Sequence, residues 1–174
     1  MDAPTPTILN RDELFAEFKK LLLNVPHKGD PIIVVLKAHL CFEGLLYKFL
    51  SEKVVQQKYL ENAKLRFEQL VNLAEAFTEP DKSAWEFTAV RSLNRLRNTL
   101  AHNLDNKKFE ERLNEFTNDV LSHDATPGGT GLVDSGFSRH YAAIMILHMS
   151  LTNKLLMKLQ FPSIFEMLAN DKGD

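Results

Sequence analysis

Three polar residues that could take part in a chemical reaction stand at helical spacing near the middle of the chain. Arg97, Asn98 and His102 lie in RSLNRLRNTLAHN, residues 91–103, whose leucines fall on one stripe of a helix. A histidine exchanges protons near neutral pH, and an arginine binds an oxyanion through two parallel hydrogen bonds. Together they suit acid–base chemistry on an anionic group, so this segment is our first candidate for a site.

The position of Arg97 raises a question, because it falls at the edge of the buried leucine stripe. A covered cation needs a partner, and Glu43 has the same need on its own apolar helix. His39 lies four residues before Glu43, so we expect a buried histidine paired with that carboxylate, with a second catalytic base as the alternative. Two interpretations remain. Arg97 and Glu43 form a structural tie between core helices, or Glu43 orients the arginine and the histidine of a site.

The elements that must position these residues are helical almost throughout. The only β-branched run, residues 32–35, leads into a longer helical pattern. Capping residues, prolines and one glycine-rich loop at 124–136 delimit helices at 11–24, 31–55, 59–78, 83–102, 107–122 and 137–160. A short turn near 163–169 follows. We predict an all-α fold, an up-and-down bundle of about five to six helices in one domain, residues 1–174.

Two of the predicted helices are unusual in their polarity. On the helix at 31–55, four residues cluster on a narrow side that we expect to face solvent: Lys37, Cys41, Gly44 and Lys48. The helix at 137–160 is apolar on most faces and rich in methionine, so it is buried in the bundle or in an oligomer. Its histidines, His140 and His148, are too far apart for one metal site on a single helix, and we interpret them as structural.

Composition excludes several classes of protein. A formal charge of -2 argues against a bulk nucleic-acid coat, so any nucleic-acid site must be a local basic patch. The single cysteine, Cys41, allows neither an intrachain disulfide nor a cysteine cluster for zinc. The longest apolar region, residues 31–50, is interrupted by charged side chains, and residues 1–9 do not read as a signal peptide. We expect a cytoplasmic protein with no membrane partner.

The run Arg97-Asn98-Thr99-Leu100-Ala101-His102 fits an R-x4-H pattern with a polar residue directly after the arginine. It resembles the signature of the HEPN superfamily, a group of all-α domains. Residues 37–50, with Glu43, resemble the family's earlier helix, and the resemblance covers about residues 30–122. Many members are metal-independent ribonucleases found as toxins, in defence and in RNA processing. They usually act as dimers in which two such segments face each other.

The resemblance implies a role for each residue. His102 would be the general acid/base, Arg97 the phosphate binder, Asn98 a positioning residue and Glu43 an orienting one. RNA carries its own nucleophile in the 2′-OH, so the resemblance implies no metal and no cofactor. The implied partners are RNA, a second copy of the chain, and an antitoxin or regulatory protein. Four basic residues could add a small RNA-contacting patch, with a solvated face as the alternative: Arg91, Arg95, Lys107 and Lys108.

The sequence also departs from one subgroup of the family. Toxins paired with a nucleotidyltransferase antitoxin often have a tyrosine two residues after the histidine, whereas His102 is followed by Asn103-Leu104. The RN-x-x-AH pattern also resembles mannitol-repressor-like proteins, which are helical regulators without an implied ribonuclease activity. A second hypothesis is therefore a non-enzymatic regulator or interaction protein, in which the motif makes structural contacts or binds a partner.

Overall fold

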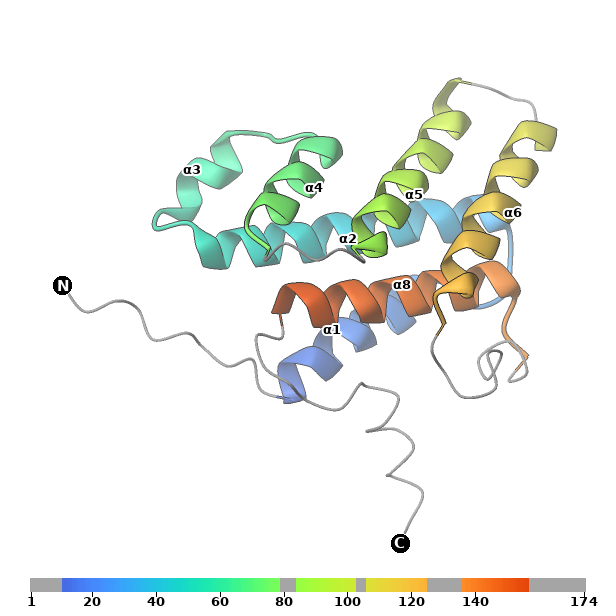
Figure 1. Cartoon of the computed structure of the whole chain (residues 1–174), viewed down its shortest axis with the longest axis horizontal. Helices are drawn as coiled ribbons and strands as arrows, with labels where there is room; N and C mark the ends of the chain where they lie inside the picture. The colour runs from blue at the N-terminus through green and yellow to red at the C-terminus, as the bar shows by residue number, and fades with distance from the viewer. Residues whose placement is uncertain (1–10, 79–83, 103–105, 125–135, 157–174) are drawn as a thin grey trace, which may run out of the picture.

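The computed structural model describes residues 11–78, 84–102, 106–124 and 136–156 (Figure 1). These residues form helices and no strand, which confirms the all-α prediction. The helices are α1 (Arg11–Asn24), α2 (Pro31–Lys53), α3 (Gln57–Asn62), α4 (Phe67–Ala76), α5 (Trp85–His102), α6 (Asn106–Ser122) and α8 (Arg139–Leu156). No helix in this part of the chain is both long and apolar enough to cross a bilayer.

One helix predicted from the sequence is two helices in the structure. The segment 59–78 contains a break between α3 and α4, where Lys64 has a φ of 46°. That left-handed conformation cannot continue a right-handed helix. A new helix starts after it, with the side chain of Gln69 accepting a hydrogen bond from the backbone N–H of Arg66 at 2.8 Å. The spacing of the apolar residues did not reveal this break, because that spacing is helical on both sides of the break.

The other predicted boundaries agree closely with the structure. Predicted and observed bounds coincide for α1. The end of α2 differs from its predicted position by two residues, and the start of α6 differs by one. The helix predicted at 137–160 begins at Arg139 and is described to Leu156. Residues 157–160, the turn near 163–169 and most of the loop at 124–136 lie outside the described residues.

Helix α2 is the centre of the bundle. It packs against α1, α4, α5 and α8, while α5 and α6 stand side by side and cross α2 and α8 (Figure 1). The core is continuous across these helices and includes Phe42 and Leu46 of α2, Leu93 of α5 and Ile144 of α8, all fully buried. This packing fixes α5, the helix that carries the candidate motif, against the rigid centre of the molecule.

Helix α8 is buried within a single chain. Every residue from Tyr141 to Met149 is buried, and the helix packs against α1, α2, α5 and α6. Burial inside the bundle, one of the two expected explanations of its apolar sequence, is therefore what the structure shows. Since the bundle already covers its apolar surface, this helix no longer provides an argument for a dimer.

The exposed side of α2 is wider and more apolar than predicted. Lys37 and Gly44 are exposed as expected, whereas Cys41 and Lys48 are half-buried. Three large apolar residues of the same helix are also exposed, with exposed fractions of 37–64%: Ile33, Leu36 and Leu40. A hydropathy pattern assigns such residues to the core, so only the arrangement of the neighbouring helices could reveal their exposure.

Candidate functional site

The motif occupies the C-terminal half of α5, the end that lies away from α2 and α8 (Figure 1). The predicted stripe packs into the core: Val90, Leu93 and Leu96 are buried and Leu100 is half-buried. This packing holds the helix in one rotational setting. The residues that follow each leucine are therefore directed to a defined side of the molecule.

Arg97 is exposed and lies beside this stripe rather than under a neighbouring helix. Its Nη1 donates a hydrogen bond to Oδ1 of Asn98 at 3.0 Å. Within the described part of the chain, no ion pair or hydrogen bond joins Arg97 to Glu43, so the expected structural tie is not formed. The reason is geometric, because a long arginine side chain at the edge of a buried stripe can extend into water.

His39 and Glu43 lie on α2, close to the base of this region. His39 is buried, its ring stacks on Phe67 with centroids 4.0 Å apart, and its Nε2 lies 3.2 Å from Oδ1 of Asn94. The expectation of a buried histidine is met, but its hydrogen-bond partner is Asn94 and not Glu43. An α5 amide reaches the ring directly, while Glu43 acts on it only through its charge.

The charges around His39 act in opposite directions. Burial lowers the pKa of His39 and is the largest influence. The hydrogen bond with Asn94 and the negative charge of Glu43 oppose this shift, whereas the positive charge of Arg97 adds to it. His39 therefore lies within electrostatic range of both Glu43 and Arg97.

Asn94 is the residue that sequence reasoning missed. Its Nδ2 donates to Oε2 of Glu68 at 3.4 Å, which turns its Oδ1 toward His39 and makes Nε2 of His39 the protonated nitrogen. Asn94 stands four residues before Asn98 and eight before His102. The three therefore form one polar stripe along α5, and this spacing was the available signal.

The guanidinium of Arg91 is bound by side chains of the neighbouring helix α4. It donates from Nε to Glu68 at 3.1 Å, and from Nη2 to Asn72 at 2.7 Å and to Glu75 at 2.5 Å. All three acceptors lie on α4, so this guanidinium fastens α5 to α4. It is the least suitable of the four predicted RNA-contacting residues, because its Nε and Nη2 already bind three acceptors of α4.

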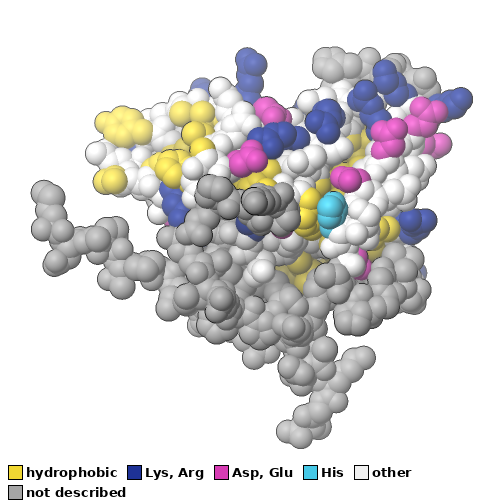
Figure 2. All heavy atoms as spheres, viewed as in Figure 1, with side chains coloured by type: hydrophobic (Ala, Val, Ile, Leu, Met, Phe, Trp, Pro, Cys, Tyr) yellow, Lys and Arg dark blue, Asp and Glu magenta, His cyan; other side chains and the backbone are white. Residues whose placement is uncertain are grey.

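The other three basic residues are on the surface. Arg95, Lys107 and Lys108 are exposed around the end of α5 and the start of α6. Figure 2 shows basic side chains gathered over this part of the molecule, with acidic side chains of α6 next to them. Glu110 and Glu111 are among the exposed acidic residues of that helix. The basic patch is therefore small and local, as expected for a chain with a slightly negative net charge.

A cation from α6 also reaches the motif. Nη1 of Arg112 donates to Oγ1 of the buried Thr99, which itself donates to the carbonyl oxygen of Arg95 at 2.9 Å. This contact holds α6 against the middle of the motif. The sequence offered no sign of it, because Arg112 is one of several charged residues on an amphipathic helix and nothing in their spacing distinguishes it.

His102 is the last residue of α5, one helical turn past Asn98. Its side chain, like residues 103–105, lies outside what the structure describes. Among the described residues, no group of three histidine, cysteine or acidic side chains is arranged to hold a metal ion. The described part of the site consists of Arg97 and Asn98 on the surface, with the network of Asn94, His39 and Glu43 beneath them.

Comparison with known proteins identifies no relative of this chain. No protein-family model, no curated protein and no solved structure matches the chain. The geometry of the site and the resemblance of its motif therefore carry the functional argument.

Proposed function

We propose that this chain is a metal-independent endoribonuclease of the HEPN type that acts as a homodimer. The observation that carries the proposal is the contrast between two arginines on α5. Arg91 is bound by three acceptors of α4, whereas Arg97 is exposed and, among the residues that the structure describes, hydrogen-bonds only to its neighbour Asn98. An arginine kept in place without a carboxylate partner can give its remaining donors to a phosphate.

The proposed reaction uses the nucleophile that RNA supplies. A histidine removes the proton of the 2′-OH, the 2′ oxygen attacks the adjacent phosphorus, and the bond to the 5′ oxygen breaks. The leaving 5′ oxygen takes up a proton, so the products carry a 2′,3′-cyclic phosphate and a 5′-OH. Arg97 stabilises the negative charge that develops on the phosphorane.

The proposed reaction requires a histidine from a second copy of the chain. Each chain contributes one histidine from the motif, His102, but the reaction requires both a base and an acid. In a dimer with the two α5 ends facing each other, His102 of one copy accepts a proton while the other copy's histidine donates one. A role as a toxin or defence nuclease, held in check by an antitoxin or regulatory partner, is the more specific form of the proposal that the family resemblance suggests.

The test is RNA cleavage in the presence of EDTA. Purified protein is incubated with total RNA and with tRNA, beside His102→Ala and the matched control His123→Ala, which changes an exposed histidine at the end of α6. We expect cleavage by the wild type and the control, no cleavage by His102→Ala, and 2′,3′-cyclic phosphate termini on the products. Cleavage that chelation abolishes, or that survives in His102→Ala, would contradict the proposal.

A non-enzymatic regulator or interaction protein is the second candidate. The exposed apolar residues Ile33, Leu36 and Leu40 on α2 favour it, because a contiguous apolar surface is typical of a site that binds another protein. A folded wild-type protein that cleaves neither RNA substrate would favour this function. In that case we expect Arg97 to contact the partner rather than a phosphate.

A further inference from the structure

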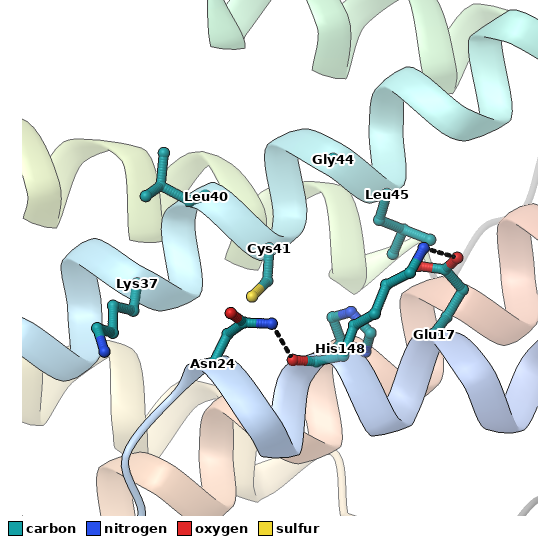
Figure 3. A pocket seen from close by; sticks show the side chains of 9 residues that line it. Glu17, Asn24, Lys37, Leu40, Cys41, Gly44, Leu45 and His148 are labelled. Atoms are coloured by element: carbon teal, nitrogen blue, oxygen red, sulfur yellow. Dashed lines mark hydrogen bonds and ion pairs between the residues drawn. The ribbon is translucent and has the colours of Figure 1, made fainter.

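A cavity of about 410 Å³ lies between α1, α2 and α8, away from the motif on α5 (Figure 3). Its walls include Leu40, Leu45 and Cys41 of α2, and His148 of α8 lies at its back. Its volume is in the range of pockets that hold small organic molecules, and its mixture of apolar walls and a few polar groups is typical of them. No step of the proposed ribonuclease reaction uses this cavity.

Gly44 forms part of the cavity wall although it stands in the interior of α2. A glycine there costs about 0.5–1 kcal/mol relative to alanine, so a structural reason for it is expected. Its backbone is not in the left-handed region, and a Cβ atom built on it would meet no atom within 4 Å. Since none of the residues that the structure describes approaches Gly44 closely, the open space is available to a bound molecule.

His148 supplies an unused hydrogen-bond acceptor at the back of the cavity. It is 2% exposed, and the hydroxyl of Thr152 donates to its carbonyl oxygen at 2.6 Å. Nδ1 of the ring lies 3.4 Å from the same hydroxyl oxygen, so Nδ1 carries the proton and Nε2 the lone pair. Burial lowers the pKa of His148 to about 4, so the ring is neutral at physiological pH. Among the described residues, Nε2 has no hydrogen-bond partner.

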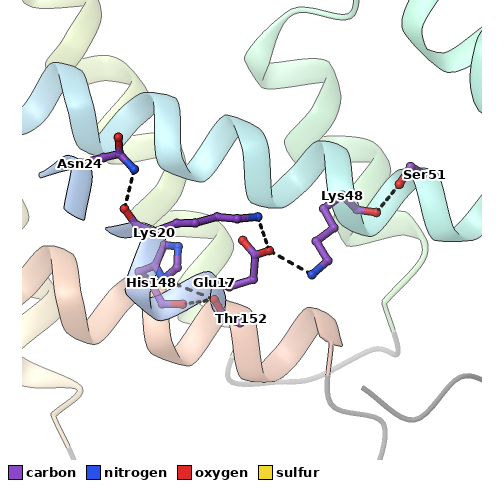
Figure 4. A network of polar contacts seen from close by, with 7 residues as sticks. All are labelled: Glu17, Lys20, Asn24, Lys48, Ser51, His148 and Thr152. Atoms are coloured by element: carbon purple, nitrogen blue, oxygen red, sulfur yellow. Dashed lines mark hydrogen bonds and ion pairs between the residues drawn. The ribbon is translucent and has the colours of Figure 1, made fainter. Parts of the chain in front are cut away.

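The charges at the cavity are mainly positive. Glu17 is buried and pairs with Lys20 at 2.6 Å and Lys48 at 3.0 Å (Figure 4). Burial alone would raise the pKa of Glu17, but the hydrogen bonds from the two lysines outweigh it and hold the pKa below its ordinary value. Lys37 also lines the cavity and makes no ion pair within the described structure. Two lysines therefore offset the charge of Glu17, and Lys37, at the other end of the cavity, is the cation that remains for a ligand (Figure 3).

We propose that this cavity binds a small amphipathic anion, with its anionic group at Lys37, its apolar body over Gly44 and Leu45, and a hydrogen-bond donor directed at Nε2 of His148. Each part of the ligand is complementary to one feature of the cavity. The anionic group matches the cation of Lys37, the apolar body matches the open apolar wall, and the donor matches the buried acceptor. The inference does not depend on the proposed ribonuclease function.

Three matched probes test the three features. 6-Hydroxyhexanoate has an anionic group, an apolar chain and a terminal donor; hexanoate lacks the donor; and 1,6-hexanediol lacks the charge. Binding is followed by chemical-shift changes of backbone amides, including that of Gly44, during titration of the full chain. We expect saturable binding of 6-hydroxyhexanoate with a Kd on the order of millimolar, weaker binding of hexanoate and the weakest binding of the diol.

Variants of the protein locate the binding. Gly44→Leu should abolish it by filling the open space, Lys37→Gln should weaken the two carboxylates but not the diol, and the control Gly44→Ala should remain folded and helical. The proposal is overturned if none of the probes gives a saturable shift, if the diol binds as tightly as the carboxylates, or if Gly44→Leu binds like the wild type. A change of oligomeric state in Gly44→Leu would show that the open space serves a second copy instead, which also overturns it.

Discussion

The contrast between Arg91 and Arg97 leads to the prediction that replacing Arg91 lowers stability, whereas replacing Arg97 lowers activity. Both arginines are on α5, six residues apart, and each is replaced by glutamine in a separate variant. Arg91→Gln removes a guanidinium that is bound by Glu68, Asn72 and Glu75, whereas Arg97→Gln removes one whose only hydrogen bond within the described part of the chain is to Asn98. The first change should damage the fold and the second should damage the function.

The size of the stability effect follows from the exposure of the groups. The side chain of Arg91 is 24% exposed, and its partners Glu68 and Glu75 are 48% and 42% exposed, so solvent screens both ion pairs substantially. At roughly 0.2–1 kcal/mol for each exposed pair, and a similar amount for the bond to Asn72, the loss is about 1–2 kcal/mol. For a domain of this length, that corresponds to a decrease in Tm of about 2–8 °C.

The effect on activity should be the reverse. Arg97 is exposed and makes one neutral hydrogen bond to the residues that the structure describes, so Arg97→Gln should change the free energy of unfolding by no more than about 0.5 kcal/mol. Loss of a donor that stabilises transition-state charge lowers rates by about 10²–10³-fold, and we expect this decrease in RNA cleavage for Arg97→Gln. Arg91→Gln should retain nearly full activity below its melting temperature.

Thermal denaturation and RNA cleavage in EDTA, measured on the same preparations, check both parts. The reasoning is refuted if Arg97→Gln lowers the Tm as much as Arg91→Gln does, since Arg97 would then have a structural partner. It is also refuted if Arg97→Gln cleaves RNA at the wild-type rate.

Three further predictions concern the rest of the bundle. Gly44→Ala should raise the free energy of unfolding by about 0.5–1 kcal/mol, measured by urea denaturation, because the added methyl group meets no atom and the helix interior favours alanine; a decrease would show that the space around Gly44 is occupied. Because the pKa of His148 is about 4 in the folded state and about 6.5 when unfolded, its stabilising effect is complete above pH 6.5 and is lost as the pH falls toward 4. Between pH 7 and pH 5 this loss amounts to about 2 kcal/mol, and His148→Phe should show a correspondingly smaller dependence on pH; an unchanged dependence would contradict the assignment. Asn94→Ala should lower the free energy of unfolding by about 1–3 kcal/mol, because the buried N–H of His39 loses its acceptor, and the double variant with His39→Phe should recover part of that loss.

Local signals in the sequence predicted most of the helices. Asp30 accepts a hydrogen bond from the backbone N–H of Ile32 at 2.8 Å, and Pro31 occupies the first turn, so the start of α2 is encoded by adjacent residues. The break at Lys64 was missed because apolar residues continue at helical spacing on both sides of it. Local rules therefore work where a cap or a proline is present, and they fail where a backbone conformation changes without one.

The candidate motif was also visible in the sequence, since the spacing of Arg97, Asn98 and His102 depends only on the pitch of one helix. The partners of its neighbours were not visible. Arg91 is bound by residues 16–23 positions away, and His39 by a residue 55 positions away, so these contacts depend on how α4 and α2 pack against α5. A pattern cannot distinguish a bound arginine from an available one when both stand on the same helix.

The sequence by itself therefore determined the all-α class, most helix boundaries and the helix that carries the motif, because each depends on interactions within a few residues. Only the tertiary structure decided which arginine is exposed, which asparagine holds His39, and that a cavity opens beside Gly44. These features arise where helices distant in the sequence meet. Their geometry is set by the packing of the whole core, which no local spacing encodes.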